Sequence, residues 1–425
     1  MPDNDEGQVA GAEMQSRRSR GGHVLVAPDK FKGTLTATQA ARHIAAGLRS
    51  VRGDLDIAQV PVADGGEGTV AAGVAAGYQP VRLGVRGPTG QPVRAEFGWR
   101  DGTAIIEAAQ ACGLARLPGG TLRPLAATSF GVGELIEAAA ARGAGRIVIG
   151  LGGVASTDGG AGMVQALGGR LLDQAGRELP PGGAALAALH RLDLAGLSPL
   201  AGIEVLVAAD VDSPLLGRHG AAAVYGPQKG ASPADVAILE AGLARWADCA
   251  ERALAGQAPA AVGRPGPRPS PRVSRPRDEP GAGAAGGLGF AALAFLGART
   301  RPGIELMLDL IGFAGRLRGA GLVITGEGSL DAQTLHGKAP AGVAHAAASA
   351  GAGPVVAIVG RCTLSTAQLH AAGIQAAYAL ADIEPDPARC LASAGPLLEE
   401  AARRLAADWL PAGVQGETPG AGREL

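Results

Sequence analysis

The chain has 425 residues, of which 69 are glycine and 29 are proline, a proportion close to that of low-complexity sequences. Because 47% of the residues are hydrophobic and no G-X-Y repeat occurs, neither a disordered chain nor a collagen accounts for this composition. The formal net charge of −1 creates no overall field for nucleic acid or a membrane surface, so we expect neither as a partner.

Short apolar runs alternate with Ala-rich helical stretches along the chain. The first run, 24–27, precedes a helix expected over 36–49, with Thr34 or Thr36 as its N-cap. Residues 58–62 are expected to form a second strand. Later strands are expected at 146–150, 204–208, 321–325, 354–359 and 375–380. This alternation favours an α/β fold with buried parallel strands.

The pattern changes between residues 80 and 108. Apolar and polar residues alternate over 80–86 and again over 92–99, and a GPTG turn at 87–90 joins the two runs. This arrangement predicts a β-hairpin. We expect the hairpin to begin a second domain.

Several segments are expected to lie outside the regular fold. The Pro/Arg-rich, non-periodic segment 257–280 is typical of a disordered insertion, and residues 1–21 and 411–425 are expected to be solvated tails. Residues 281–298 are uncharged but rich in Gly and Ala, which predicts a tight loop and a buried helix rather than a membrane span. Residues 1–21 lack the apolar core of a signal peptide, and the 4 cysteines lack metal or redox spacing, so we expect a cytoplasmic location.

Acidic and glycine residues recur directly after the predicted strands. The loops concerned are residues 28–33, 64–69, 152–160, 210–214 and 326–331. Ligands of open α/β sheets bind beyond the carboxyl ends of the strands, so we expect these loops to converge on one crevice. Glycine N–H groups bind phosphate oxygens, lysines neutralise phosphate charge, and carboxylates hold Mg²⁺ or orient a hydroxyl nucleophile. The combination indicates phosphoryl transfer, whereas any one loop alone is equally typical of caps and turns.

Of two known nucleotide-binding motifs, the sequence lacks one and matches the other. A Walker A motif is absent, because its nearest candidate, residues 337–338, is followed by alanine, which excludes a P-loop kinase. Residues 150–155 match G-x-G-x-x-A, with Asp173 at about the required distance of 20 residues, and this match keeps a dinucleotide-dependent (NAD-type) oxidoreductase as an alternative. Asp158 argues against that alternative, since it would face the pyrophosphate.

At these loops the chain resembles the type-1 glycerate kinase family. The motifs that carry the resemblance are residues 27–35 (APDKFKGTL), 62–69 (VADGGEGT), 127–136 (ATSFGVGELI), 152–163, 225–231 (YGPQKGA), 281–289 and 325–338. The resemblance spans about residues 23–408, apart from the insertion. It implies phosphorylation of D-glycerate with ATP and Mg²⁺. It also implies a Rossmann- or flavodoxin-like parallel-sheet domain interrupted by a second α/β (α+β) domain, with the active site in the crevice between them.

The resemblance and the change of pattern together suggest the domain boundaries. Residues 22–79 and 300–410 are assigned to the discontinuous first domain, and residues 80–299 to the inserted one. The oligomeric state stays open, with a homodimer as one option. The family product is usually 2-phosphoglycerate, and the residues do not decide between it and 3-phosphoglycerate.

Loop position and the resemblance suggest roles for individual residues. Asp64 is the leading candidate to orient the acceptor hydroxyl, and Asp331 is the second. Lys32 is expected to contact phosphate or the glycerate carboxylate, and Mg²⁺ is expected at Asp210 and Asp158. The remaining substrate- and phosphate-binding candidates are Asp29, Lys30, Gly65, Gly66, Thr157, Asp158, Lys229, Gly326, Glu327, Gly328 and Lys338.

The sequence departs from the family pattern in two loops. Lys30 stands where the family has serine, which adds a positive charge to the first loop. Ala209 and Ser213 stand where the family has cysteine and asparagine, and both changes are between small side chains.

Overall fold

The computed structural model describes residues 22–197, 200, 202–257 and 275–410. The predicted tails and most of the predicted insertion lie outside these residues. The chain divides into two compact units, one containing the residues up to Pro61 and from Ala314 onward (unit 1), the other Val62–Phe313 (unit 2). Each unit has its own sheet and its own core of buried apolar side chains.

The sheet of unit 1 has five parallel strands in the order β15-β13-β11-β1-β2. The strands are β1 (His23–Pro28), β2 (Ile57–Gln59), β11 (Ala320–Gly326), β13 (Val355–Val359) and β15 (Ile374–Ala379). Counted along the chain, this is the 2-1-3-4-5 order of flavodoxin-like folds, in which the direction of winding reverses between β1 and β11. The predicted parallel α/β domain is confirmed, including these five strands.

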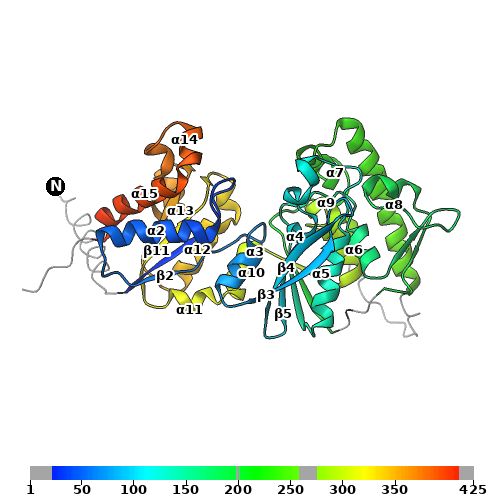
Figure 1. The fold of residues 1–425 in the computed structure, drawn as a ribbon, viewed down its shortest axis with the longest axis horizontal. Helices are drawn as coiled ribbons and strands as arrows, with labels where there is room; N and C mark the ends of the chain where they lie inside the picture. Colours follow the sequence, from blue (N-terminus) through cyan, green and yellow to red (C-terminus); the bar gives the residue numbers. More distant parts are fainter. Residues whose placement is uncertain (1–21, 198–199, 201, 258–274, 411–425) are drawn as a thin grey trace, which may run out of the picture. The chain divides into compact units, whose positions relative to one another are not determined.

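Helices pack against the sheet of unit 1. They are α2 (Ala37–Val51), α12 (Ala339–Ser349), α13 (Thr366–Ala371) and α15 (Ala394–Trp409). Helix α14 (Pro387–Ala392) contacts α15, and α11 (Phe313–Leu317) joins the units in sequence. Thr36 forms a capping box with Gln39, which identifies Thr36 rather than Thr34 as the N-cap of α2. Helices α2 and α15 lie side by side (Figure 1) and bury Ile44 and Leu405 between them and the sheet.

The sheet of unit 2 is mixed, with the strand order β10-β9-β6-β5-β4-β3. Its strands are β3 (Gln79–Arg86), β4 (Pro92–Arg100), β5 (Thr103–Glu107), β6 (Arg146–Gly150), β9 (Glu204–Ala208) and β10 (Arg299–Arg301). Strands β3, β4 and β5 are antiparallel, which confirms the predicted hairpin, and β5, β6, β9 and β10 are parallel. Strands β6 and β9 have the predicted bounds.

The other elements of unit 2 surround this sheet. They are α3 (Thr69–Ala75), α4 (Ala108–Cys112), α5 (Phe130–Ala141), α6 (Ala161–Ala166), α7 (Ala221–Tyr225), α8 (Pro233–Gln257), α9 (Ala284–Leu296), α10 (Gly303–Leu310) and the ribbon of β7 (Arg170–Leu172) and β8 (Arg191–Asp193). Trp246 of α8 is fully buried and stacks on Phe295 of α9 with ring centroids 5.5 Å apart. The loop and buried helix expected over 281–298 are therefore present. No helix in the described part of the chain is long and apolar enough to cross a membrane.

The boundaries between the two units differ from the predicted boundaries at 79/80 and 299/300. Residues 62–78 belong to unit 2 because α3 packs on β5, and residues 300–313 belong to it because α10 packs on β9. A predicted boundary at 79/80 or 299/300 would separate these helices from the strands that they cover. Helix–strand packing of this kind is a tertiary property that the change of pattern at residue 80 does not reveal.

The end of the predicted insertion is structured. Residues Pro276–Asp278 form a 3₁₀ turn, and the guanidinium group of Arg277 lies 2.8 Å from the carboxylates of both Asp248 and Glu251 of α8. The prediction of disorder is therefore wrong for residues 275–280. Its Pro/Arg-rich composition gave no sign of these acidic partners.

Candidate active site

The loops after β1 and β11 meet where the winding of the unit 1 sheet reverses. The Asp29 N–H donates to the carbonyl oxygen of Gly326 at 2.8 Å, which holds the two loops side by side. Gly328 packs against the backbone of Lys32 on the same edge of the sheet. Ligands of doubly wound sheets bind at this reversal point, so the position supports the predicted importance of both loops.

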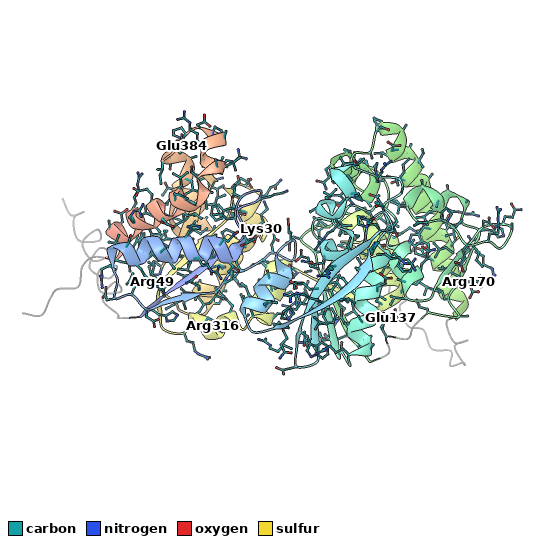
Figure 2. The ribbon with its side chains drawn as sticks, viewed as in Figure 1. Lys30, Arg49, Glu137, Arg170, Arg316 and Glu384 are labelled. Atoms are coloured by element: carbon teal, nitrogen blue, oxygen red, sulfur yellow. The ribbon has the colours of Figure 1, made fainter. Side chains whose placement is uncertain are left out.

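The charged residues of the first loop differ in exposure. Asp29 is buried, and its Oδ1 accepts a hydrogen bond from the Lys30 backbone N–H at 2.6 Å. The ammonium group of Lys30 (Figure 2) lies 3.8 Å from the same oxygen, whereas Lys32 is exposed. Lys30 therefore offsets the buried charge of Asp29, and Lys32 is placed to meet an anion from solution.

The second loop is organised around Glu327. The Glu327 carboxylate is buried and accepts a hydrogen bond from the Thr334 hydroxyl. Asp331 accepts a hydrogen bond from the Gln333 N–H at 2.9 Å, and Lys338 Nζ lies 3.4 Å from the Gln333 side-chain oxygen. Asp331 thus shapes the turn next to Thr334, and its second-choice role of orienting the acceptor hydroxyl stays a prediction.

In unit 2 a glycine-rich loop crosses the carboxyl ends of β6 and β9. Gly65 has a φ of +87°, and a Cβ there would lie 2.6 Å from the Cβ of Ala208. A Cβ at Gly150 would overlap the Gly65 carbonyl oxygen. Asp64 Oδ1 accepts a hydrogen bond from the Gly66 N–H at 3.2 Å. Glycines from two predicted motifs are therefore needed to bring Asp64 to this edge of the sheet.

Asp64 and Asp210 both lie next to Gly303, the first residue of α10. The Gly303 N–H donates to Asp210 Oδ1 at 2.7 Å, and a Cβ on Gly303 would overlap the Asp64 carbonyl oxygen. Burial raises the pKa of Asp210 to about 6, the Gly303 N–H opposes this shift, and the charges of Asp64 and Glu305 add to it. The structure therefore brings together the leading hydroxyl-orienting candidate and one of the two predicted metal ligands.

Asp210→Asn is expected to stabilise the metal-free protein by about 1 kcal/mol near neutral pH, because solvent screens the charge of this exposed residue, and to have little effect at about pH 4. Because the folded-state pKa of Asp210 is raised to about 6, the stability linked to its protonation is present below the unfolded-state pKa and is lost as the pH rises through about 6. Asparagine keeps an acceptor for the Gly303 N–H without the charge. Urea unfolding in EDTA across this pH range measures the effect, and a pH-independent difference would contradict the account.

Glu107 is a buried carboxylate that the sequence analysis missed. It ends β5, and its Oε2 accepts hydrogen bonds from the N–H groups of Gly68 at 3.0 Å and Val70 at 3.3 Å. These bonds fix the start of α3 and with it the end of the Asp64 loop. The sequence feature that could have indicated Glu107 is a carboxylate at the end of an otherwise apolar strand.

The residues around Asp64 and Asp210 fit a Mg²⁺ ion. Proteins hold Mg²⁺ with one or two carboxylates, and substrate phosphates and water complete the coordination. A cation here would favour the charged form of Asp210, whose pKa is raised mainly by desolvation and further by the charges of Asp64 and Glu305. No group of three or more His, Cys, Asp or Glu side chains in the described ranges could hold a metal, so phosphate and water would have to supply the other ligands.

Asp158, the other predicted metal ligand, is engaged within the protein. Its carboxylate is buried and accepts four hydrogen bonds, from the N–H and hydroxyl of Ser129 and from the N–H groups of Gly160 and Gly162, at 2.8–3.2 Å. This environment favours a role in positioning the start of α6. Burial depends on tertiary packing, which the loop sequence does not show.

Lys229 is also placed inside unit 2. Only 3% of Lys229 is exposed, and its Nζ donates to the Ser156 carbonyl oxygen at 2.5 Å and to the Thr157 hydroxyl at 3.4 Å. Burial lowers the pKa of Lys229 to about 8. A Cβ on Gly286 would lie 2.8 Å from this Nζ, so the 281–289 loop packs against Lys229. This placement differs from the triphosphate contact expected for Lys229 and from the substrate contact expected for Thr157.

The dinucleotide-like pattern has another explanation. Gly150 is required by the approach of Gly65, and Asp173 accepts hydrogen bonds from the N–H groups of Ala175 and Arg177 in a local turn. Neither residue is arranged around a dinucleotide site.

Comparison with known proteins identifies the family. A sequence model described as Glycerate kinase family matches residues 24–410. The chain belongs to the glycerate kinase family. It is 44% identical over 388 residues to the glycerate kinase of Bacillus subtilis (strain 168), covering 90% of this chain and 97% of the relative. It is 42% identical over 361 residues to the glycerate 2-kinase of Escherichia coli (strain K12), covering 84% of this chain and 90% of the relative.

A solved structure agrees with this assignment. A protein from Salmonella typhimurium LT2, provisionally named glycerate kinase 2, has a crystal structure that matches with a TM-score of 0.74 and 40% identity. The match covers 91% of this chain and 97% of the solved one. Glycerate kinases are phosphotransferases, so the predicted enzyme class is confirmed and the oxidoreductase alternative is excluded.

Proposed function

We propose that the protein transfers the γ-phosphoryl group of ATP to the 2-hydroxyl of D-glycerate, producing 2-phosphoglycerate and ADP. Membership of the glycerate kinase family supports the substrate and the donor. The observation that carries position 2 is the 42% identity to a relative named glycerate 2-kinase. Phosphorylation at position 3 is the alternative outcome.

Asp64 is proposed to receive the proton of the attacking hydroxyl. The hydroxyl oxygen bonds to the γ-phosphorus while the bond from that phosphorus to the bridging oxygen of ADP breaks. The Gly66 N–H, at 3.2 Å from Asp64 Oδ1, holds the carboxylate in one orientation. Asp210, which also lies next to Gly303, would hold Mg²⁺. When bound, Mg²⁺ neutralises phosphate charge.

Lys32 is proposed to bind an anionic group of the substrates. Lys32→Met is expected to lower kcat/KM at least tenfold, because a charge-assisted contact with phosphate or carboxylate is lost. Arg49→Met is the matched control, since Arg49 is another exposed cation of unit 1, at the end of α2 (Figure 2). Steady-state kinetics with both substrates measure the effect. A Lys32→Met enzyme with the kcat/KM of the control would rule out this role.

An enolase-coupled assay tests the position of phosphorylation. Enolase dehydrates 2-phosphoglycerate directly, but 3-phosphoglycerate only after a mutase has moved the phosphate. We expect ATP, D-glycerate and enolase to yield phosphoenolpyruvate without added mutase. A strict requirement for the mutase would refute position 2 and leave the kinase activity itself intact.

A further inference from the structure

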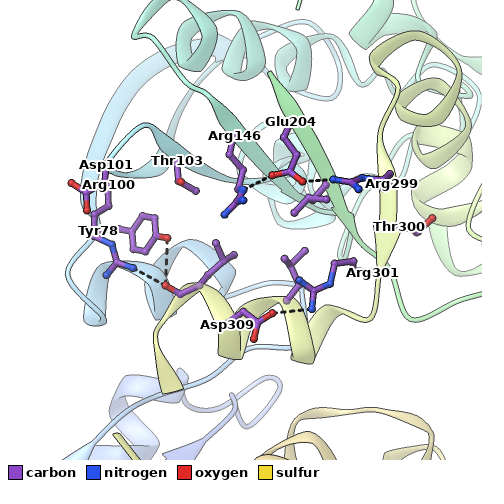
Figure 3. Close-up of a pocket in the computed structure, with 13 residues that line it drawn as sticks. Tyr78, Arg100, Asp101, Thr103, Arg146, Glu204, Arg299, Thr300, Arg301 and Asp309 are labelled. Carbon is purple, nitrogen blue, oxygen red and sulfur yellow. Dashed lines mark hydrogen bonds and ion pairs between the residues drawn. The ribbon is translucent and has the colours of Figure 1, made fainter. Parts of the chain in front are cut away.

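A polar pocket of about 540 Å³ lies at the amino ends of the parallel strands of unit 2. Figure 3 shows its lining, to which the first residues of four neighbouring strands contribute: Thr103 of β5, Arg146 of β6, Glu204 of β9 and Arg299 of β10. Asp64 and Asp210 lie at the carboxyl ends of this sheet. The pocket therefore belongs to the opposite edge and has no part in the proposed reaction.

Helix α10 and the β4 strand end complete the pocket. Arg301 pairs with Asp309 of α10 at 2.8 Å. Arg100 donates to the Leu310 carbonyl oxygen at 2.7 Å and lies over the Tyr78 ring, 4.2 Å from its centroid. In Figure 3 the Arg146–Glu204–Arg299 group lies on one side of the pocket and these α10 contacts lie on the other. Guanidinium groups thus face the cavity from two sides.

The pocket has more positive than negative side chains, since four arginines face the three carboxylates of Asp101, Glu204 and Asp309. Arg146 and Arg299 share the Glu204 carboxylate, and the Arg146 hydrogen bond is the main cause of the lowered pKa of Glu204. Glu204 therefore holds the Arg146 and Arg299 side chains next to each other at the edge of the pocket.

The arginines keep most of their hydrogen-bonding capacity. A guanidinium group has five N–H donors in a planar fork that matches carboxylate and phosphate oxygens. Arg146, Arg299 and Arg301 each use one side-chain nitrogen in a hydrogen bond to the described part of the protein. Arg299 is 71% exposed, so its remaining donors are accessible from solution.

We propose that this pocket binds a small organic anion with two anionic groups, such as a phosphorylated carboxylic acid. Its volume lies within the range of small-molecule sites, about 300–1,000 Å³. The two sets of arginines can each receive one anionic group, and Thr103 and Thr300 add hydroxyl groups to the lining. This proposal does not depend on the substrate of the phosphotransferase reaction.

Calorimetric titration with phosphoenolpyruvate tests the proposal. The intact enzyme is first saturated with D-glycerate and a non-hydrolysable ATP analogue, which keeps the probe out of the active site. Wild type is expected to bind one phosphoenolpyruvate, and Arg299→Gln is expected to bind at least tenfold more weakly. Arg170→Gln is the control, because Arg170 (Figure 2) is an exposed arginine of unit 2 paired with a glutamate, Glu178, outside the pocket.

Kinase activity provides the check on folding. Arg299→Gln is expected to keep the wild-type kcat, because the residue is exposed and remote from Asp64 along the strands. Equal affinity of Arg299→Gln and wild type would overturn the proposal. So would a complete loss of wild-type binding once the active site is filled, or an equal loss of binding in Arg170→Gln.

Discussion

Asp64→Asn is expected to lower kcat about 100-fold or more, because asparagine cannot accept the proton of the attacking hydroxyl. The substitution keeps a side-chain oxygen for the Gly66 N–H, which lies 3.2 Å from Asp64 Oδ1. The loop should therefore keep its shape, and KM should change much less than kcat. Steady-state kinetics with saturating ATP measure both constants.

Asp193→Asn is the matched control for this experiment. Asp193, at the end of β8, accepts a hydrogen bond from the N–H two residues later, at 3.1 Å, in the same way as Asp64. The control should keep the wild-type kcat. If Asp64→Asn retained near-normal kcat, Asp64 would not be the proton acceptor, and Asp210, whose pKa is raised to about 6 by burial, would be the next candidate.

Gly303→Ala is expected to destabilise the protein by about 2–3 kcal/mol and to lower kcat together with stability. A Cβ on Gly303 would overlap the Asp64 carbonyl oxygen and lie 3.1 Å from Asp210 Oδ2. Because the neighbouring atom is backbone, the Asp64 loop must move away from α10 and the two carboxylates must separate. Chemical unfolding and kinetics on the same preparation measure the two effects.

Gly84→Ala is the control for the glycine experiment. Gly84 lies within β3, its φ is not positive, and a Cβ there would meet no atom within 4 Å. This substitution should be neutral or slightly stabilising, because alanine reduces the freedom of the unfolded chain. If Gly303→Ala behaved like Gly84→Ala, the close contact of α10 with the Asp64 loop would not determine the geometry of the site.

The regular elements could be predicted from the sequence because their signals are local. Strands β6 and β9 are apolar runs bounded by charged and glycine residues, and Thr36 with Gln39 forms a capping box within four residues. The rule that ligand sites follow parallel strands also placed Asp64 and Asp210 correctly on one edge of a sheet. The domain boundaries and the ordered residues 275–280 depend on packing between distant segments, which no local pattern reports.

The structure explains the high glycine content more specifically than the sequence does. Glycines after the strands were expected to let backbone approach phosphate. At Gly65, Gly150, Gly286 and Gly303 the described structure shows a close approach to other protein atoms. The contacts at Gly65, Gly150 and Gly303 orient the Asp64 loop, and the contact at Gly286 packs the 281–289 loop against Lys229. The atoms that approach a glycine are determined by the tertiary fold, so the composition alone could not identify them.

The predicted site residues differ in their burial, and the sequence could not predict this difference. Asp158 and Lys229 have the same motif character as Asp64 and Lys32, but they are buried and bonded within unit 2. Ser129, which donates two hydrogen bonds to Asp158, and the residues that accept from Lys229 are far away in sequence. The chemical type of these side chains was therefore predictable, whereas their burial was not.

Phosphorus NMR of the reaction product tests the central claim most directly. The enzyme is incubated with ATP, Mg²⁺ and D-glycerate, and the proton-coupled phosphorus signal of the product is recorded. A phosphate on carbon 2 couples to the single proton of that carbon and gives a doublet, which is the result that we predict. A triplet would show phosphate on carbon 3 and contradict the proposed position, and no new phosphomonoester signal would contradict glycerate phosphorylation itself.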